Sequence, residues 1–190
     1  MKTQESGMPS EEIWEGFFAP KQTLEKLGLT VHCRNVADFG CGYATFTIPA
    51  AQLVEGTVYA LDIEPEMLAA TKAKAHAANL RNIETIQRDF AADGSGLPAG
   101  SMDYVMLFNI LHAEERMTLL NEAWRILAVG GRLSVIHWNY DPTTPRGPNM
   151  SIRPRPEQCR AWAESVGFVM LPPGRIDLPP YHYGFVFNRP

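Results

Sequence analysis

Short apolar runs alternate with longer segments of helical character along most of the chain. Apolar runs of strand length, bounded by turn residues, indicate buried strands. A regular alternation of strand and helix is the sequence sign of a parallel sheet with helices on both of its faces. The expected strands are residues 35–39, 58–62, 83–88, 104–109 and 132–137.

The segments between these strands carry helix signals. Met117, Leu120, Trp124 and Leu127 recur at intervals of three and four residues, which predicts one apolar stripe facing the sheet. Pro65 suits the first position of a helix because the first N–H groups of a helix have no partner within it. The helices are expected at residues 22–27, 45–54, 65–78, 114–127 and 156–167.

The alternation stops after Gly167. Residues 168–171 and 175–178 are interpreted as one interrupted strand, and residues 183–187 as another, with no helix between them. A connection without a helix implies an antiparallel pair. The predicted fold class is therefore α/β: a single Rossmann-like, doubly wound, mostly parallel seven-stranded sheet that ends in an antiparallel hairpin, with helices on both faces.

The first thirty residues are expected to form an N-terminal tail and helical segment, ahead of one domain at residues 31–190. Ser10 is suited to cap a helix that carries Ile13 and Trp14, and Phe17 and Phe18 follow. Two interpretations of these large apolar side chains remain open. They either pack on the sheet edge or the next helix, or form a lid over a ligand.

Residues 36–45 read as a strand, a tight turn and the start of a helix. Glycine has no Cβ, so the backbone at Gly40 and Gly42 is able to lie directly against a ligand. The turn differs from the dinucleotide fingerprint G-x-G-x-x-G because its last position is Thr45. Asp38 stands two residues before the first glycine, where its charge would repel a pyrophosphate. A ligand with positive charge suits this turn better, and S-adenosylmethionine has an ammonium group, a sulfonium and no phosphate.

Four motifs together resemble a known family. They are Asp38-x-Gly40-x-Gly42, Leu61-Asp62, Arg88-Asp89-Phe90 and the segment 127–133 with its double glycine. In this order the motifs resemble the S-adenosylmethionine-dependent methyltransferases with a Rossmann-like fold, of the type 11 or ubiquinone/menaquinone methyltransferase kind. The likeness covers about residues 31–188. Ala44 replaces the third glycine of the family's turn, and Val129 replaces the proline usual before the double glycine.

The resemblance implies S-adenosylmethionine as the cofactor and assigns roles at the strand ends. Asp62 follows Gly42 by twenty residues; the spacing alone also fits a helix cap, and the resemblance favours a bond to the ribose hydroxyls, with Ile63 beside the adenine. Asp89 and the backbone of Phe90 are expected at the adenine ring. The expected cofactor-binding residues are Asp38, Phe39, Gly40, Cys41, Gly42, Asp62, Ile63, Met67, Asp89, Phe90 and Asn109. Cys41 itself is expected to be a small buried filler.

Methyl transfer requires a general base only when the acceptor must lose a proton. His112, His137 and Tyr140 are the catalytic candidates, because they lie near strand ends where an open α/β sheet binds ligands. His182 and Tyr181 are further candidates for this role. The alternative for each histidine is a role in packing.

The 139–155 loop is rich in Pro, Gly and Arg. Arg153 is the expected clamp for an anionic acceptor, together with Arg146 and Arg155, because guanidinium groups match carboxylate geometry. A proline-stiffened, solvated loop is the alternative. Trp138 and His182 complete the expected substrate residues.

Composition narrows the function classes. A net charge of -4 provides no basic footprint for nucleic acid. No apolar run is long enough to span a bilayer, and residues 1–7 lack the apolar region of a signal peptide, so a cytoplasmic location is expected. The three cysteines are widely spaced, which favours reduced thiols and no metal site. The oligomeric state is left open.

The predicted function is transfer of a methyl group from S-adenosylmethionine to a small-molecule acceptor, such as a quinone-like, aromatic or carboxylated compound. One alternative is a nicotinamide-dependent oxidoreductase, which Asp38 and Thr45 disfavour. The other is a regulatory module that binds S-adenosylmethionine without turnover.

Overall fold

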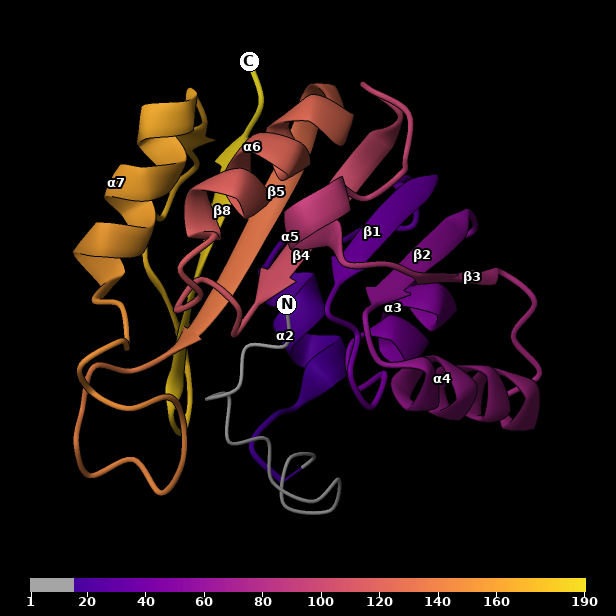
Figure 1. The fold of residues 1–190 in the computed structure, drawn as a ribbon, viewed down its shortest axis with the longest axis horizontal. Helices are drawn as coiled ribbons and strands as arrows, with labels where there is room; N and C mark the ends of the chain where they lie inside the picture. The colour runs from indigo at the N-terminus through magenta and orange to yellow at the C-terminus, as the bar shows by residue number, and fades with distance from the viewer. Residues whose placement is uncertain (1–15) are drawn as a thin grey trace.

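The computed structural model describes residues 16–190, which form one eight-stranded sheet with helices on both faces (Figure 1). The strand order is β3-β2-β1-β4-β5-β8-β6, and β7 also pairs with β8. The strands are β1 (Asn35–Phe39), β2 (Thr57–Asp62), β3 (Ile83–Gln87), β4 (Met102–Phe108), β5 (Leu127–Trp138), β6 (Val169–Met170), β7 (Ile176–Leu178) and β8 (His182–Asn188). Strands β1 to β5 are mutually parallel and β8 is antiparallel to β5, as the sequence predicts.

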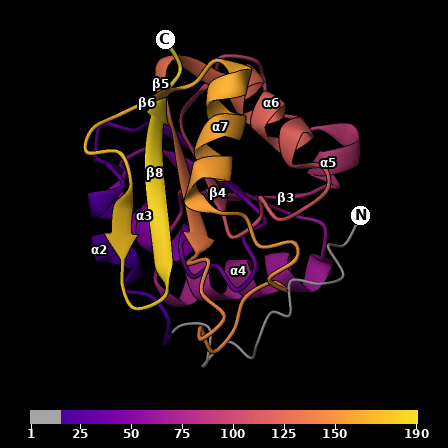
Figure 2. The same cartoon turned by 90° about the vertical axis from the view of Figure 1, so that its left-hand side faces the viewer.

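The outer edge beyond β8 consists of the interrupted strand expected from the sequence. Both of its pieces, β6 and β7, pair antiparallel with β8, which runs opposite to its neighbours (Figure 2). A turn at Pro172-Pro173-Gly174 separates the pieces, because proline has no N–H to donate to a ladder. The sheet therefore has eight strands where seven were expected, because β6 and β7 are the two pieces of one expected strand.

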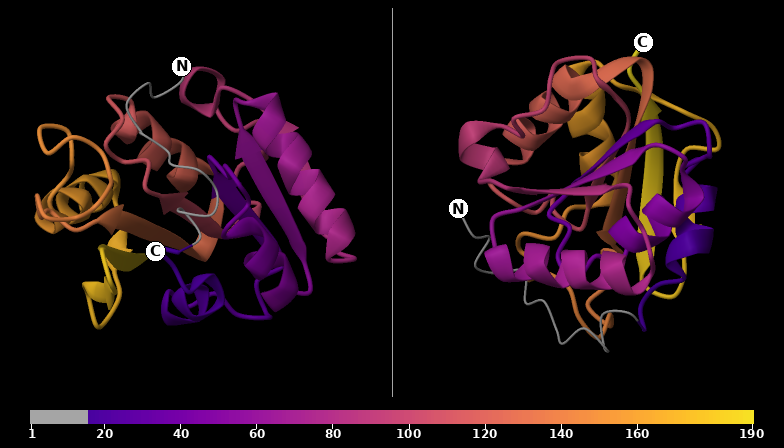
Figure 3. Two further views of the ribbon diagram at one scale, coloured as in Figure 1. Left: turned by 90° about the horizontal axis from the view of Figure 1, so that it is seen from below. Right: turned by 90° about the vertical axis from the view of Figure 1, so that its right-hand side faces the viewer.

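The helices form two layers around the sheet (Figure 3). Helices α2 (Pro20–Lys26), α3 (Thr47–Leu53) and α4 (Pro65–Ala77) cover one face. Helices α5 (Phe90–Asp93), α6 (Arg116–Ile126) and α7 (Pro156–Val166) cover the other. Each layer closes its own apolar core, one with Leu24, Ala50 and Tyr104 and the other with Leu120 and Cys159. The longer helices lie within two residues of their predicted bounds, whereas α5 was not expected.

The strand order places a switch point between β1 and β4. From β1 the chain first builds outward through β2 and β3, and then returns to the other side of β1 to form β4. The carboxyl ends of the parallel strands meet at one edge of the sheet, which is the lower edge in Figure 1. In open α/β sheets, ligands bind outside this edge at the switch point.

Phe17 and Phe18 pack against the sheet at this edge. The Phe18 ring centroid lies 5.0 Å from that of Phe46 and 4.3 Å from that of His182. The Phe17 ring lies 5.2 Å from the Trp138 ring. Both interpretations of the two phenylalanines stay predictions, because packing at this edge also suits a cover over a ligand. The expected cap at Ser10 and the side chains of Ile13 and Trp14 lie outside the described residues.

Gly56 provides a test of the packing between β1 and β2. A Cβ atom at Gly56 would lie 1.8 Å from the carbonyl oxygen of Arg34, which accepts the Thr57 N–H at 2.7 Å. The backbone must therefore move if a side chain is added. We expect Gly56→Ala to lower the free energy of unfolding in urea by about 3 kcal/mol.

Gly130 is the matched control, because a Cβ there meets nothing within 4 Å although its φ is +82°. Gly130→Ala should cost about 1 to 2 kcal/mol, from left-handed backbone strain alone. Equal losses for the two variants would contradict the steric explanation.

Candidate active site

The glycine turn after β1 is folded onto the end of β2. The N–H groups of Gly40 and Cys41 both donate to the Leu61 carbonyl oxygen, at 2.8 and 3.0 Å. The Gly42 N–H donates to Oδ2 of Asp62 at 2.9 Å. Gly40 and Gly42 have φ angles of +74° and +50°, a region that favours glycine. Three successive N–H groups of the turn are thus used within the protein.

Asp62 presents a carboxylate that is anchored but not saturated. Its Oδ1 accepts the Glu64 N–H at 3.0 Å, and its Oδ2 accepts the Gly42 N–H and, at 4.0 Å, the Cys41 thiol. No side chain caps α4, so Asp62 holds the segment before the helix and does not act as its cap. An ionised carboxylate offers about four acceptor sites, so Oδ1 retains the capacity for a further bond, and at Oδ2 a hydroxyl would displace the weakly bound thiol. This geometry suits a pair of hydroxyl groups.

Asp38 is a buried carboxyl group, only 3% exposed. The Thr47 hydroxyl donates to Oδ2 of Asp38 at 2.6 Å. Burial raises the pKa of Asp38 to about 7, the Thr47 hydrogen bond opposes this rise, and the charge of Asp62 adds to it. A neighbouring cation would relieve the cost of ionising Asp38. The sequence does not predict this role of Thr47, because no local pattern indicates a hydrogen bond between a residue of α3 and a residue of β1.

The predicted adenine side of the site contains the short helix α5. The side chain of Asp89 accepts the Ala92 N–H at 3.1 Å and so caps α5. The Phe90 ring lies 5.0 Å from the Phe39 ring in the core. The adenine roles of Asp89 and of the Phe90 backbone stay predictions, as do those of Ile63 and Met67.

Cys41 is buried beside the turn, as expected for a filler. Its Sγ lies 3.7 Å from the Thr71 hydroxyl. Burial raises the pKa of the Cys41 thiol far above its ordinary value. The group is therefore a neutral thiol at neutral pH.

Asn109 follows β4 at the switch point and has a φ of +55°, which is uncommon for a residue other than glycine. Its N–H donates to the Ile136 carbonyl oxygen at 2.8 Å. Both polar atoms of its side-chain amide are buried without a hydrogen-bond partner among the described residues. Backbone strain and unpaired buried polar atoms in one residue indicate a functional site.

His112 and His137 lie next to each other, with ring centroids 5.6 Å apart. Both rings are buried, and their nitrogens have at most weak contacts with the backbones of Asn109 and Trp138, without a hydrogen bond of standard geometry. Burial, followed by the positive charge of Arg116, lowers the pKa of His112 to about 4. Burial, followed by the charge of His112, lowers the pKa of His137 well below its usual value. Both imidazoles are therefore neutral at pH 7.

The sheet separates these two histidines from two of the expected substrate residues. In the β5 and β8 pair, His137 is opposite Tyr183 and Trp138 is opposite His182. Directly opposite residues share a face of the sheet and successive residues alternate. Tyr183 belongs to the core under α6 and α7, whereas the His182 ring contacts Phe18 at 4.3 Å on the other face. Trp138 and His182 thus do not form one cluster with His112 and His137.

Arg153 does not have the expected role. It is 6% exposed, and its guanidinium group donates to Asn139, Asp141, Thr144, Arg146 and Pro148 at distances from 2.6 to 3.2 Å. Guanidinium has five N–H groups, and these contacts use them within the loop. The expectation of an anion clamp at Arg153 was wrong, because this residue holds the 139–155 loop together.

Tyr140 lies in the same loop and is 36% exposed. The guanidinium carbon of Arg155 lies 3.9 Å from the centroid of its ring. Tyr140 is therefore engaged with the loop, and its catalytic role stays a prediction.

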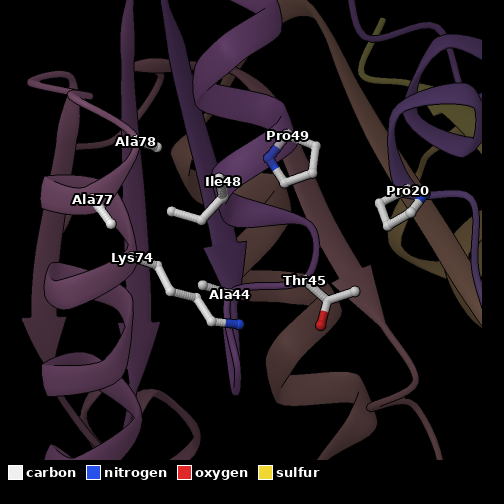
Figure 4. Close-up of a pocket in the computed structure, with 8 residues that line it drawn as sticks. All are labelled: Pro20, Ala44, Thr45, Ile48, Pro49, Lys74, Ala77 and Ala78. Carbon is white, nitrogen blue, oxygen red and sulfur yellow. The ribbon is translucent and has the colours of Figure 1, made fainter. Parts of the chain in front are cut away.

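A groove of about 560 Å³ lies along α3 beside the turn (Figure 4). Apolar side chains predominate, and the Lys74 ammonium donates to the Tyr43 carbonyl oxygen at 2.8 Å. Its lining residues are Pro20, Ala44, Thr45, Ile48, Pro49, Lys74, Ala77 and Ala78. The groove is lined by none of the strand-end carboxylates or histidines.

Within residues 16–190, no three His, Cys, Asp or Glu side chains are grouped so that they would hold a metal ion. No helix in this part of the chain is long and apolar enough to cross a bilayer.

Comparisons with known proteins point to one family. Residues 36–131, half of the chain, match the family described as a methyltransferase domain. The chain is 33% identical over 122 residues to the aklanonic acid methyltransferase DauC of Streptomyces sp. strain C5. This alignment covers 62% of this chain and 54% of DauC. It is 35% identical over 105 residues to a demethylmenaquinone methyltransferase of Listeria welshimeri, covering 54% of this chain and 44% of that enzyme. The chain thus spans about half the length of these curated relatives.

Solved structures share the fold. A methyltransferase from Aquifex aeolicus, described as S-adenosylmethionine-dependent, superposes with a TM-score of 0.83 at 21% identity. The likeness covers 95% of this chain and 94% of the Aquifex chain. At this identity the comparison establishes the shared fold.

The raised pKa of Asp38 makes stability depend on pH. A carboxyl group with a folded pKa near 7 and an ordinary value of 3.8 keeps its proton longer in the folded state. The wild type therefore loses stability as the pH rises from about 4 through 7. We expect Asp38→Asn to be more stable than the wild type by about 2 to 4 kcal/mol at pH 8, in urea unfolding, and by less at pH 5.5.

Asp103→Asn is the control, because Asp103 is a carboxylate that accepts two backbone N–H groups, of Arg34 and Asn35, at the opposite edge of the sheet. It should show no gain that grows with pH. A difference between Asp38→Asn and the wild type that is the same at both pH values would refute the buried ionisation of Asp38.

Proposed function

The chain belongs to the methyltransferase-domain family, and from this premise we propose that it transfers a methyl group from S-adenosylmethionine to a small-molecule acceptor. The observation that carries the proposal is the use of the turn's N–H groups. Gly40, Cys41 and Gly42 all donate to the end of β2. In a dinucleotide fold, the corresponding N–H groups bind pyrophosphate. Here these N–H groups bind the Leu61 carbonyl and the Asp62 carboxylate instead.

S-adenosylmethionine, the cofactor of this family, fits the residues of this edge. The acceptor sites of Asp62 suit the two ribose hydroxyls, and an ammonium group would stabilise the ionised form of Asp38. The unpartnered amide of Asn109 offers both a donor and an acceptor at the switch point. Nothing in this set requires a phosphate ligand.

When bound, the cofactor supplies a methyl group already activated by the sulfonium. The protein's main task is then to hold the acceptor in line with that methyl group, which is worth roughly 7–11 kcal/mol of barrier reduction. His112 is our proposed base for an acceptor that must lose a proton. Its imidazole is neutral at pH 7 and lies three residues after Asn109. His137 is fully buried next to it.

The acceptor class is proposed from the names of the relatives. One relative acts on aklanonic acid and another on demethylmenaquinone, an organic acid and a quinone. Both names support a quinone-like, aromatic or carboxylated acceptor. The free thiols of Cys33, Cys41 and Cys159 support the cytoplasmic location that we propose.

Calorimetric titration tests the cofactor site. The wild type should bind S-adenosylhomocysteine and not NAD. Asp62→Ala should weaken this binding at least about tenfold, because hydrogen bonds to a charged group are each worth about 1.5–3 kcal/mol. Asp103→Ala, which also removes an acceptor of two backbone N–H groups, should leave the affinity unchanged.

Tight binding of NAD in place of S-adenosylhomocysteine would support the oxidoreductase alternative and end our proposal. Equal weakening by Asp62→Ala and Asp103→Ala would show a loss of folding and not a loss of ribose contacts. Measuring the unfolding of both variants separates these outcomes.

Turnover is the second test. With a panel of quinol, phenol and carboxylate acceptors, the wild type should release S-adenosylhomocysteine and methylated product. His112→Gln should lower kcat by about 100-fold or more on a phenolic acceptor, without changing the affinity for S-adenosylhomocysteine. His76→Gln on the exposed side of α4 is the control. Cofactor binding without turnover of any acceptor would favour the regulatory module.

A further inference from the structure

Arg116, the first residue of α6, is a cation without an anionic partner in the described structure. None of the ion pairs among residues 16–190 involves it, and no hydrogen bond of its guanidinium group is present there. Its Nε is buried and unpaired. The chain neighbours Glu114 and Glu115 form no ion pair with it in this part of the chain. Burying part of an unpaired cation is unfavourable unless another group compensates.

The Arg116 side chain is held in place by an aromatic ring. Its guanidinium carbon lies 4.8 Å from the centroid of the Trp162 ring on α7. A guanidinium stacked on an aromatic face has a restricted orientation, and the stacking leaves its in-plane N–H groups available for bidentate bonds. The half-buried Trp162 therefore orients the cation without using its donors.

Arg116 lies close to His112, whose ring neighbours that of His137. Its charge contributes to the lowered pKa of His112, which places the two side chains within electrostatic range. The His112 and His137 rings are 5.6 Å apart. All three residues lie on the face of the sheet covered by α6 and α7. Two uncharged imidazoles and one unpaired cation thus line the same side of the strand-end site.

We propose that Arg116 binds a carboxylate of the methyl acceptor and thereby selects a carboxylated aromatic acceptor over an uncharged one. The proposal rests on the proposed function, since it places the acceptor next to His112. Arg116 is a residue that determines specificity and positions the acceptor. It takes no proton and forms no covalent bond.

Other arginines of the region are already engaged. Arg153 donates throughout the 139–155 loop, and Arg155 stacks on the Tyr140 ring. Arg160 on α7 forms an ion pair with Glu164 at 2.8 Å. Arg116 is therefore the guanidinium group best suited to an anionic ligand at this side. The other cation expected for that role, Arg153, is a structural residue of the loop.

Two probes that differ by one carboxylate test the proposal. Hydroxynaphthoate and naphthol are titrated into the protein saturated with S-adenosylhomocysteine. The wild type should bind hydroxynaphthoate at least about tenfold more tightly than naphthol, because the carboxylate gains a charge-assisted pair of hydrogen bonds. Arg116→Gln should abolish this preference and leave the naphthol affinity within about twofold.

Arg160→Gln is the matched control, because Arg160 is an exposed arginine on α7 whose loss should change neither affinity. The pKa of His112, measured by NMR, provides a second readout. Hydroxynaphthoate should raise the pKa of His112, followed by NMR, because it neutralises Arg116. Arg116→Gln should raise this pKa without any ligand.

Equal affinities of the wild type for the two probes would overturn the proposal. Binding of neither probe, or a preference that survives in Arg116→Gln, would overturn it as well. Failure of the wild type to bind S-adenosylhomocysteine would contradict the proposed function itself. Intact S-adenosylhomocysteine binding without a carboxylate preference would contradict only the role of Arg116.

Discussion

The constraint on which the site depends is the attachment of the glycine turn to the end of β2. Because the Leu61 carbonyl and the Asp62 carboxylate take the N–H groups of Gly40, Cys41 and Gly42, these three donors are not available to a phosphate. The same bonds fix Asp62 at the strand end with acceptor capacity for a ligand. One small set of hydrogen bonds thus disfavours a dinucleotide cofactor with its pyrophosphate and positions Asp62 to bind hydroxyl groups.

The electrostatics of the edge follow from burial. Asp38, with a pKa raised to about 7, gives up stability that a cationic ligand would restore. The imidazoles of His112 and His137 are kept neutral by the same desolvation, and Arg116 adds to the effect on His112. Burying an ionisable group without a partner costs stability, and a ligand that pairs with the group restores it. Such destabilised, perturbed groups are typical of functional sites.

At the carboxyl edge, the two faces of the sheet carry different groups of side chains. On the face covered by α6 and α7, His137 and Tyr183 are opposite each other, close to His112. On the other face, His182 packs between aromatic rings, 4.2 Å from Trp138 by ring centroids. Successive side chains of a strand point to opposite faces of the sheet. His137 and Trp138, which are consecutive in β5, therefore lie on different faces. A loop held by Arg153 then joins β5 to α7.

Local patterns of apolar residues and glycines are sufficient to predict the alternation of strands and helices, the antiparallel end of the sheet and the glycine turn. Which side chains have partners is visible in the folded chain alone. The sequence does not show that the Arg153 donors are used within its loop while Arg116 is left unpaired, since both are arginines at or just before the start of a helix. The hydrogen bond of Thr47 to Asp38 likewise joins separate elements. Periodicity is a local property, whereas burial and pairing depend on contacts between distant segments.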